Sequence, residues 1–381
     1  MKKIYLIFCL FVVAQTVCSQ TIYSTINSSK LGEERQLKIQ LPRNYEQNIE
    51  KKYPLIVVLD GDYLFEPFAG NVDYYSYWDD IPEAIVVGIN MDETRNEDCF
   101  YDEKSTLPVK SGALFFEFIG MELLPHIDQK YRTSDFQIIA GHNLSANFLN
   151  YYLFKEEPIF EAYISLSPDL ASEMAERIHY SLNTAAYPRW YYLATGQNDI
   201  SRIKEGILAL DAQLKTIQND NVRYRFRDFE EASHYSLVGY AIPDALIQIF
   251  ASYPPMGVKE YDQMVAVGSS PYDFLVSKYD MIKHDYGMEK KIRINDFLTT
   301  GKALEAIQNW EQMEALGKLA RKQYPNSALG TYYLARAYEA SGDPKKAMRT
   351  YQMAYGQEEV AFITIDFMLK KAELIKKDFG Y

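Results

Sequence analysis

Runs of consecutive apolar residues recur along the first two thirds of the chain and alternate with amphipathic segments. The runs cover residues 53–59, 84–89, 136–140, 162–167 and 189–194, and residues 222–226 are expected to form the last strand. Strands that are apolar at every position are typical of a parallel sheet with helices on both faces. Between two of them, residues 112–129 carry apolar side chains at helical spacing. Residues 21–41 alternate as in a β-hairpin. The pattern predicts an α/β domain with a doubly wound, mostly parallel sheet.

The last third of the chain has a purely helical pattern. Tyr253–Gly257 contains two prolines and a glycine and predicts a domain boundary. Residues 328–359 match the small and large positions of a tetratricopeptide repeat, and a weaker copy lies about 34 residues upstream. We expect the α/β domain to cover 20–252, a linker and helix 253–290, and an all-α helical-repeat domain 291–381. A plain helical hairpin is the alternative for the repeats.

The N-terminus has the composition of an export signal. Lys2 and Lys3 precede a short apolar run over 4–14, and small residues before Gln20 offer a cleavage site. We therefore expect residues 1–19 to be removed and the protein to be periplasmic or secreted, with no transmembrane helix in the mature chain. Lipoprotein anchoring through Cys18 is a less favoured alternative. Cys99 alone would then remain, so no intrachain disulfide can form.

Composition removes several classes of function. The formal net charge is −12, whereas nucleic-acid binding needs clustered Lys and Arg, so no nucleic-acid partner is expected. The sequence shows no Cys/His metal spacing, no Walker loop and no G-x-G-x-x-G. We expect neither a cofactor nor a metal.

The most informative motif follows the apolar run 136–140. Gly141-His-Asn-Leu-Ser-Ala146 lies between a predicted strand and a predicted helix over 146–154. Strand, sharp turn and helix form the context of the G-x-S-x-G nucleophile elbow of α/β-hydrolases. Asn143 stands where that motif has its serine. A carboxamide has no proton that a histidine can remove to create an attacking oxyanion.

Two further positions fit the order nucleophile, acid, histidine that triads of this fold follow. Asp199 comes just after the run ending at residue 194, although a turn-capping role is also open for it. His234 lies in a loop after the last predicted strand, unlike the other four of the five histidines. For an oxyanion, the expected donors are the backbone N–H groups of Leu144 and of Gly61 or Asp62.

These segments together resemble the Putative esterase family of α/β-hydrolases, which includes enterobactin esterases and esterase D-like proteins. The resemblance covers about residues 25–251. It rests on residues 53–62, on 86–89 with Arg95 and Asp98 downstream, on 118–131, on the elbow and on the loop of His234. Residues 274–279 and the helices after them resemble the repeat-bearing tail of some exported members. The resemblance implies Ser-His-Asp ester hydrolysis, and it transfers the histidine role to His234 and the acid role to Asp199.

The elbow departs from the family pattern at Asn143, Ser145 and Ala146. Asn tolerates unusual backbone conformations better than most residues, so it can keep the turn while deleting the attacking group. We therefore expect a pseudo-esterase with little or no activity that binds an ester-like ligand or a protein partner.

Two other classes of function stay open. The chain could be an active carboxylesterase or siderophore-type esterase that uses His234 with Ser145, with a water molecule or with a deamidated Asn143. Ser145, however, is expected to point into the helix. Alternatively, the helical repeats could make the chain a scaffold for protein partners.

Overall fold

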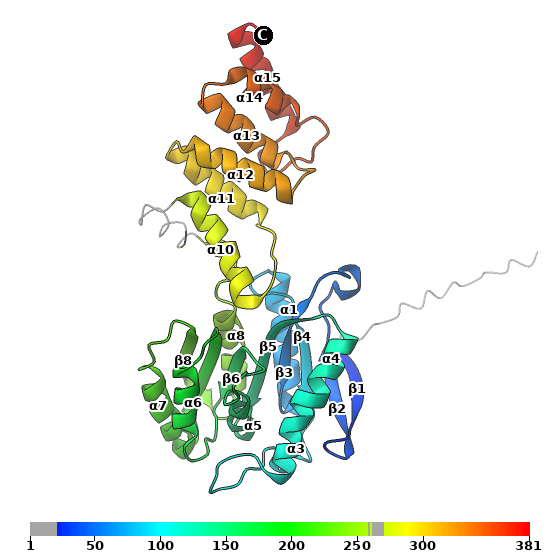
Figure 1. Ribbon diagram of the computed structural model, residues 1–381, viewed down its shortest axis with the longest axis vertical. Coiled ribbons are helices and arrows are strands. Elements are labelled where there is room, and N and C mark those ends of the chain that lie inside the picture. Colours follow the sequence, from blue (N-terminus) through cyan, green and yellow to red (C-terminus); the bar gives the residue numbers. More distant parts are fainter. Residues whose placement is uncertain (1–20, 258–259, 261–269) are drawn as a thin grey trace, which may run out of the picture.

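A single twisted sheet forms the centre of the first part of the protein (Figure 1). The computed structural model describes residues 21–257, 260 and 270–381. The sheet has eight strands in the order β1-β2-β4-β3-β5-β6-β7-β8. Their bounds are β1 (Thr21–Ser28), β2 (Glu33–Gln40), β3 (Tyr53–Val58), β4 (Ile85–Ile89), β5 (Thr133–His142), β6 (Ala162–Leu166), β7 (Arg189–Asn198) and β8 (Val222–Ser233).

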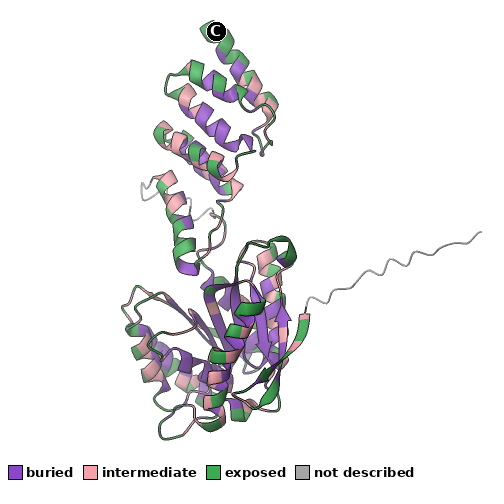
Figure 2. Cartoon of the chain, turned by 45° about the vertical axis from the view of Figure 1, so that its right-hand side comes forward, coloured by how far each residue is buried: buried purple, intermediate pink, exposed green. Residues whose placement is uncertain are grey.

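The topology is that of a doubly wound sheet with a hairpin at one edge. β1 pairs antiparallel with β2, and β2 antiparallel with β4, while every pair from β4 to β8 is parallel. The parallel strands β3 and β4 are buried at every position, because helices cover both faces (Figure 2). The predicted α/β-hydrolase fold class is confirmed.

Successive residues of a strand point to opposite faces and join separate hydrophobic clusters. Ile56 and Val58 pack with residues of α1 (Gly61–Tyr77) and α8 (Leu237–Ile249). Leu55 and Val57 face the opposite cluster. The helices on that second side are α3 (Lys110–Phe118), α4 (Leu124–Lys130), α5 (Leu144–Phe148), α6 (Met174–Asn183) and α7 (Ser201–Leu214), and the short α2 (Arg95–Asp98) follows β4.

Several predicted elements have different bounds in the structure. The helix expected over 112–129 is split by a π-turn at Ile119–Leu123, since Pro125 has no N–H and cannot continue the α-helical ladder. The helix expected over 146–154 starts at Leu144 and turns into a 3-10 helix over Leu149–Tyr152. β8 runs well beyond residue 226, to Ser233. It is an edge strand of the sheet, where exposed polar residues are tolerated. A further 3-10 turn covers Tyr45–Gln47.

Helices alone make up the second part of the described chain, and they stack away from the sheet (Figure 1). They are α10 (Pro271–Tyr286), α11 (Ile294–Ala306), α12 (Trp310–Gln323), α13 (Ala328–Ala340), α14 (Pro344–Gln352) and α15 (Ile365–Phe379). Neighbouring helices approach closely at glycines: a Cβ on Gly301 would lie 2.3 Å from the Tyr333 ring. The predicted helical region is confirmed, while its assignment as tetratricopeptide repeats and the domain boundaries stay predictions.

The helical part is joined to the sheet at the edge where the parallel strands begin. Tyr286 of α10 packs on Phe136 and Trp190, near the starts of β5 and β7, with ring centroids 5.2 and 5.7 Å away. Asp79, just beyond α1, forms ion pairs with Lys290 and Arg293. The candidate site described below lies at the opposite edge, where these strands end.

The expectations about export and membrane spans meet the structure differently. The predicted signal peptide, residues 1–19, lies outside the described residues. Among the helices of the described part, none is both long and apolar enough to cross a membrane.

Candidate active site

The carboxyl ends of the parallel strands bring together the residues that the sequence singles out. His142 pairs with Leu166, and Leu166 with Ala194, in the registers of β5, β6 and β7. The residues that follow these strands therefore lie side by side. Asn143 is next to the turn after β6, and Asp199 and His234 follow the ends of β7 and β8.

Asn143 occupies a strained turn of the elbow type. Its backbone has φ 60° and ψ −113°, a conformation that non-glycine residues rarely adopt and that concentrates at functional sites. The turn is held on both sides: the N–H of Asn143 donates to the Leu166 carbonyl at 3.0 Å, and its own carbonyl accepts from Asp169 N–H at 3.2 Å. The elbow geometry predicted from the motif is thus present, with an amide in place of a hydroxyl.

Asp199 and His234 form a buried pair beside the elbow. Nδ1 of His234 lies 2.7 Å from Oδ1 of Asp199, and the two residues are 7% and 9% exposed. An ionised carboxylate only accepts hydrogen bonds, so the proton must lie on Nδ1. The other ring nitrogen, Nε2, then carries the lone pair that a general base needs. This is the tautomer that ester hydrolysis would require of His234.

Further donors hold the Asp199 carboxylate. Ser167 Oγ and Thr195 Oγ1 donate to Oδ2 at 2.7 and 2.8 Å, and the Ile200 N–H donates to Oδ1 at 2.8 Å. Ser167 was not predicted from the sequence. It follows β6, has φ 43°, and also lies 3.0 Å from His234 Nδ1. The signal that could have found it is a hydroxyl residue directly after a strand next to the elbow strand.

Gly196 allows the Asp199 carboxylate to reach His234. The register of β7 with β8 shifts between Gly196 and Asn198. A Cβ on Gly196 would lie 2.3 Å from the Ala232 carbonyl oxygen, so only glycine lets the strands close there. The shift redirects the chain so that Asp199 meets the histidine of the neighbouring strand.

The predicted oxyanion donors lie at the starts of two helices. Leu144 is the first residue of α5, and Gly61 is the first residue of α1. N–H groups in the first turn of a helix have no partner within the helix. The Asp62 carboxylate accepts from Met91 N–H at 2.8 Å, so its side chain is committed to the loop after β4. The role of the three backbone groups stays a prediction.

Ser145 is committed to a different network. It is fully buried, and its Oγ donates to Asp60 Oδ2 at 2.5 Å while accepting from His142 N–H at 2.9 Å. Asp60 is also paired with Arg95. These two hydrogen bonds hold the Ser145 hydroxyl inside the protein and stabilise the turn. This agrees with the expectation that the Ser145 side chain points into the helix.

A second histidine lies next to the candidate triad. His142 is 1% exposed, and its ring centroid is 4.7 Å from that of His234. Burial, together with nearby His234, lowers the pKa of His142 to about 4, so the ring is neutral at pH 7. Among the described residues, no group of three or more His, Cys, Asp and Glu is placed to hold a metal ion.

Comparison with known proteins agrees with this geometry. The family pattern described as Putative esterase matches residues 28–191, which include the elbow but end before Asp199 and His234. No curated protein matches the chain. An uncharacterised protein from Capnocytophaga ochracea is 31% identical, with a TM-score of 0.87 over 94% of this chain and 100% of that one.

Two other solved structures match a smaller share of the chain. The BES protein from Bacillus cereus is 25% identical, with a TM-score of 0.54 over 63% of this chain and 97% of that one. An IroE-like serine hydrolase from Shewanella oneidensis is 19% identical, with a TM-score of 0.60 over 79% and 99%, and supports the fold alone. An α/β-hydrolase fold with a strained elbow and an Asp-His pair defines the class. The chain belongs to the Putative esterase family.

Proposed function

We propose that this protein is a pseudo-esterase, which keeps the ester-binding site of its family but has lost the covalent attack. The observation that carries the proposal is the combination of an intact Asp199–His234 pair with Asn143 at the strained elbow. Acyl transfer by this fold needs a hydroxyl oxygen that loses its proton to the histidine as it attacks the ester carbonyl. The Asn143 amide offers no such proton.

The remaining groups still suit recognition of an ester. Backbone N–H groups of Leu144 and Gly61 can donate to a carbonyl oxygen, and the Asn143 amide can both donate and accept. A site of this kind binds an ester or a related carbonyl ligand without cleaving it. Where a triad lacks its nucleophile, the oxyanion donors and substrate binding leave roughly 10³–10⁴-fold catalysis over water.

The buried state of Ser145 argues against the first alternative, an esterase that uses this serine. Its hydroxyl donates to Asp60 and lies on the side of the turn that faces the helix. Attack from Ser145 would require breaking that hydrogen bond and reversing the side chain. Water activated by His234 would instead give slow turnover that depends on the histidine but not on Ser145.

Turnover of p-nitrophenyl acetate by the mature chain from Gln20 tests the proposal. We expect no measurable turnover by the native chain and a gain of at least about 100-fold in Asn143→Ser, because a serine at the elbow completes the triad. The double variant Asn143→Ser/His234→Ala should lose that gain. Ser145→Ala, measured in the native background, is the matched control for the alternative nucleophile.

Two results would contradict the proposal. Native turnover that disappears in Ser145→Ala would identify a working esterase with a displaced nucleophile. A silent Asn143→Ser variant with an unchanged fold would show that more than the hydroxyl has been lost, and that the site no longer places an ester against His234.

A further inference from the structure

The buried His142 has a partner on each ring nitrogen. Nε2 lies 3.0 Å from the backbone carbonyl oxygen of His234, and Nδ1 lies 3.0 Å from the hydroxyl of Tyr63. A carbonyl oxygen only accepts, so Nε2 must carry the proton. In a neutral ring Nδ1 is then the acceptor that faces the Tyr63 hydroxyl.

The Tyr63 hydroxyl lies 3.0 Å from Nδ1 and 3.2 Å from Asp60 Oδ2, so the ring and the carboxylate share its one proton. Tyr63 keeps its proton, because burial and the Asp60 carboxylate raise its pKa. Arg95 donates to the His142 backbone carbonyl at 2.9 Å and to both oxygens of Asp60. Burial and the nearby ring of His234 lower the pKa of His142. The tautomer of His142 is therefore fixed by the His234 carbonyl, which needs a proton on Nε2.

The contacts of His142 connect loops that are far apart in the sequence. Tyr63 lies in the first turn of α1, directly after the predicted oxyanion donors Gly61 and Asp62. His142 ends β5, immediately before the elbow residue. His234 lies in the turn after β8. One line of hydrogen bonds thus runs from the oxyanion side of the site, past the elbow, to the loop of the general base.

We propose that His142, oriented by Tyr63, is a positioning residue that fixes the His234 loop through the backbone carbonyl of His234. Asp199 and Ser167 contact the ring of His234 at Nδ1, whereas His142 contacts its backbone carbonyl. His142 makes this backbone contact without a charge. A cationic neighbour would oppose the proton that His234 takes up when a nucleophile attacks. An effect of His142 on hydrolysis rests on the proposed function. The hydrogen bonds of His142 can be tested on the native chain, even if it hydrolyses no ester.

Imidazole NMR of the native chain gives the first test, since the chain has only five histidines. We expect His142 to stay in the neutral Nε2–H form between pH 5 and pH 8. The Nδ1 proton of His234, donated to Asp199, should give a low-field resonance protected from exchange. An Nδ1–H tautomer of His142, or a cationic ring at pH 6, would overturn the proposal.

Variants separate positioning from general stability. In His142→Leu we expect the low-field His234 resonance to broaden, because the loop loses its anchor. In His142→Gln, whose amide can still donate to the carbonyl, the resonance should persist. Tyr63→Phe removes the donor to Nδ1 and should raise the pKa of His142. His284→Gln, at an exposed position on α10, is the matched control. If His142→Leu does not fold, His142→Gln and Tyr63→Phe still test whether His142 positions the His234 loop.

Hydrolysis in the Asn143→Ser background gives the second test. Loss of one hydrogen bond is worth about tenfold, so His142→Leu should lower kcat by about 10-fold with KM little changed. His142→Gln should stay within about 3-fold. Equal rates for the leucine and glutamine variants would contradict the positioning role. If Asn143→Ser shows no hydrolysis at all, the proposed function fails, and the NMR results on the native chain still decide the role of His142.

Discussion

Asp199 is the residue at which burial and hydrogen bonding compete most clearly. Burial alone would raise the pKa of its carboxyl group. The hydrogen bonds from His234, Ser167, Thr195 and the Ile200 N–H outweigh that effect and lower the pKa below its usual range. The carboxylate therefore stays ionised in the folded protein at any pH near neutrality, which keeps the proton of His234 on Nδ1.

A depressed pKa makes a prediction about acid stability. A carboxyl group whose pKa is lower in the folded than in the unfolded state stabilises the protein above about pH 4 and loses this effect as the pH falls. We expect Asp199→Asn to lower the free energy of unfolding by about 2 kcal/mol at pH 7. The difference from the native chain should shrink as the pH is lowered toward 3. Urea unfolding at both pH values measures it.

An exposed loop aspartate supplies the control for this pH dependence. Asp220→Asn removes the same charge at an exposed position and should change stability by less than about 0.5 kcal/mol at either pH. A constant difference between the native chain and Asp199→Asn across the pH range would show that the carboxylate is not stabilised by its donors.

Sequence reasoning reached only part of the site, for a physical reason. Asn143, Asp199 and His234 could be predicted because chain order and strand ends constrain them. Ser167 and Thr195 could not, since neither belongs to a motif and each matters only through a contact across strands. The contact from Ser145 to Asp60, 85 residues away in the chain, has the same character.

At the scale of elements, the turn from β5 into α5 depends on close approach of strand and helix. A Cβ on Gly141 would lie 2.7 Å from both the carbonyl carbon and the hydroxyl of Ser145. Real Cβ atoms almost never approach so closely, so the strand end or the helix would have to move. The Asp60 contact of Ser145 fixes the helix side, which leaves little room for such a shift.

We therefore predict that Gly141→Ala destabilises the protein by about 1–3 kcal/mol, as expected for overpacking in a well-packed region. Gly70→Ala is a matched control, because Gly70 lies within α1 with nothing near its Cβ position. That substitution should stabilise the protein by about 0.5–1 kcal/mol. The midpoints of urea unfolding of Gly141→Ala and Gly70→Ala, each compared with the native chain, measure these changes. A neutral Gly141→Ala would mean that the elbow helix is free to shift.

The same elements show where a hydrophobic pattern is sufficient and where it is not. The parallel strands β3 to β7 could be located from their apolar runs, because burial on both faces leaves few polar positions. The end of β8 could not, since an edge strand with alternating polar residues looks like a loop once the apolar run stops. The π-turn at Ile119–Leu123 also escaped, because helical periodicity does not register one extra residue.

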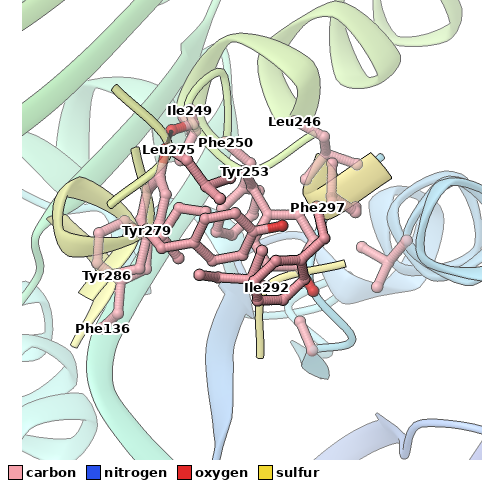
Figure 3. Packing of buried hydrophobic residues seen from close by; sticks show 14 of the residues in the cluster. Phe136, Leu246, Ile249, Phe250, Tyr253, Leu275, Tyr279, Tyr286, Ile292 and Phe297 are labelled. Carbon is pink, nitrogen blue, oxygen red and sulfur yellow. Dashed lines mark hydrogen bonds between the residues drawn. The ribbon is translucent and has the colours of Figure 1, made fainter. Parts of the chain in front are cut away.

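At the scale of the whole molecule, one hydrophobic cluster continues from the sheet into the helical part. Figure 3 shows Phe136 and Phe250 of the sheet-containing part packed with Tyr279 and Tyr286 of α10. Tyr286 is 1% exposed, and its hydroxyl donates to the Ile249 carbonyl at 2.9 Å. Because the cluster is continuous, unfolding of one part exposes apolar surface of the other, and the two parts should unfold together.

Removing the central aromatic ring of this junction tests that coupling. Tyr286→Ala should cost roughly 3–5 kcal/mol, as for other buried aromatic rings. It should also separate the unfolding of the sheet from that of the helical part, since Trp190 reports on the junction and Trp310 lies in α12. Tyr180→Ala, at a position 70% exposed on α6, is the matched control and should leave a single transition. If Tyr286→Ala still unfolds in one step at the midpoint of the control, the Tyr286 ring is not what couples the two parts.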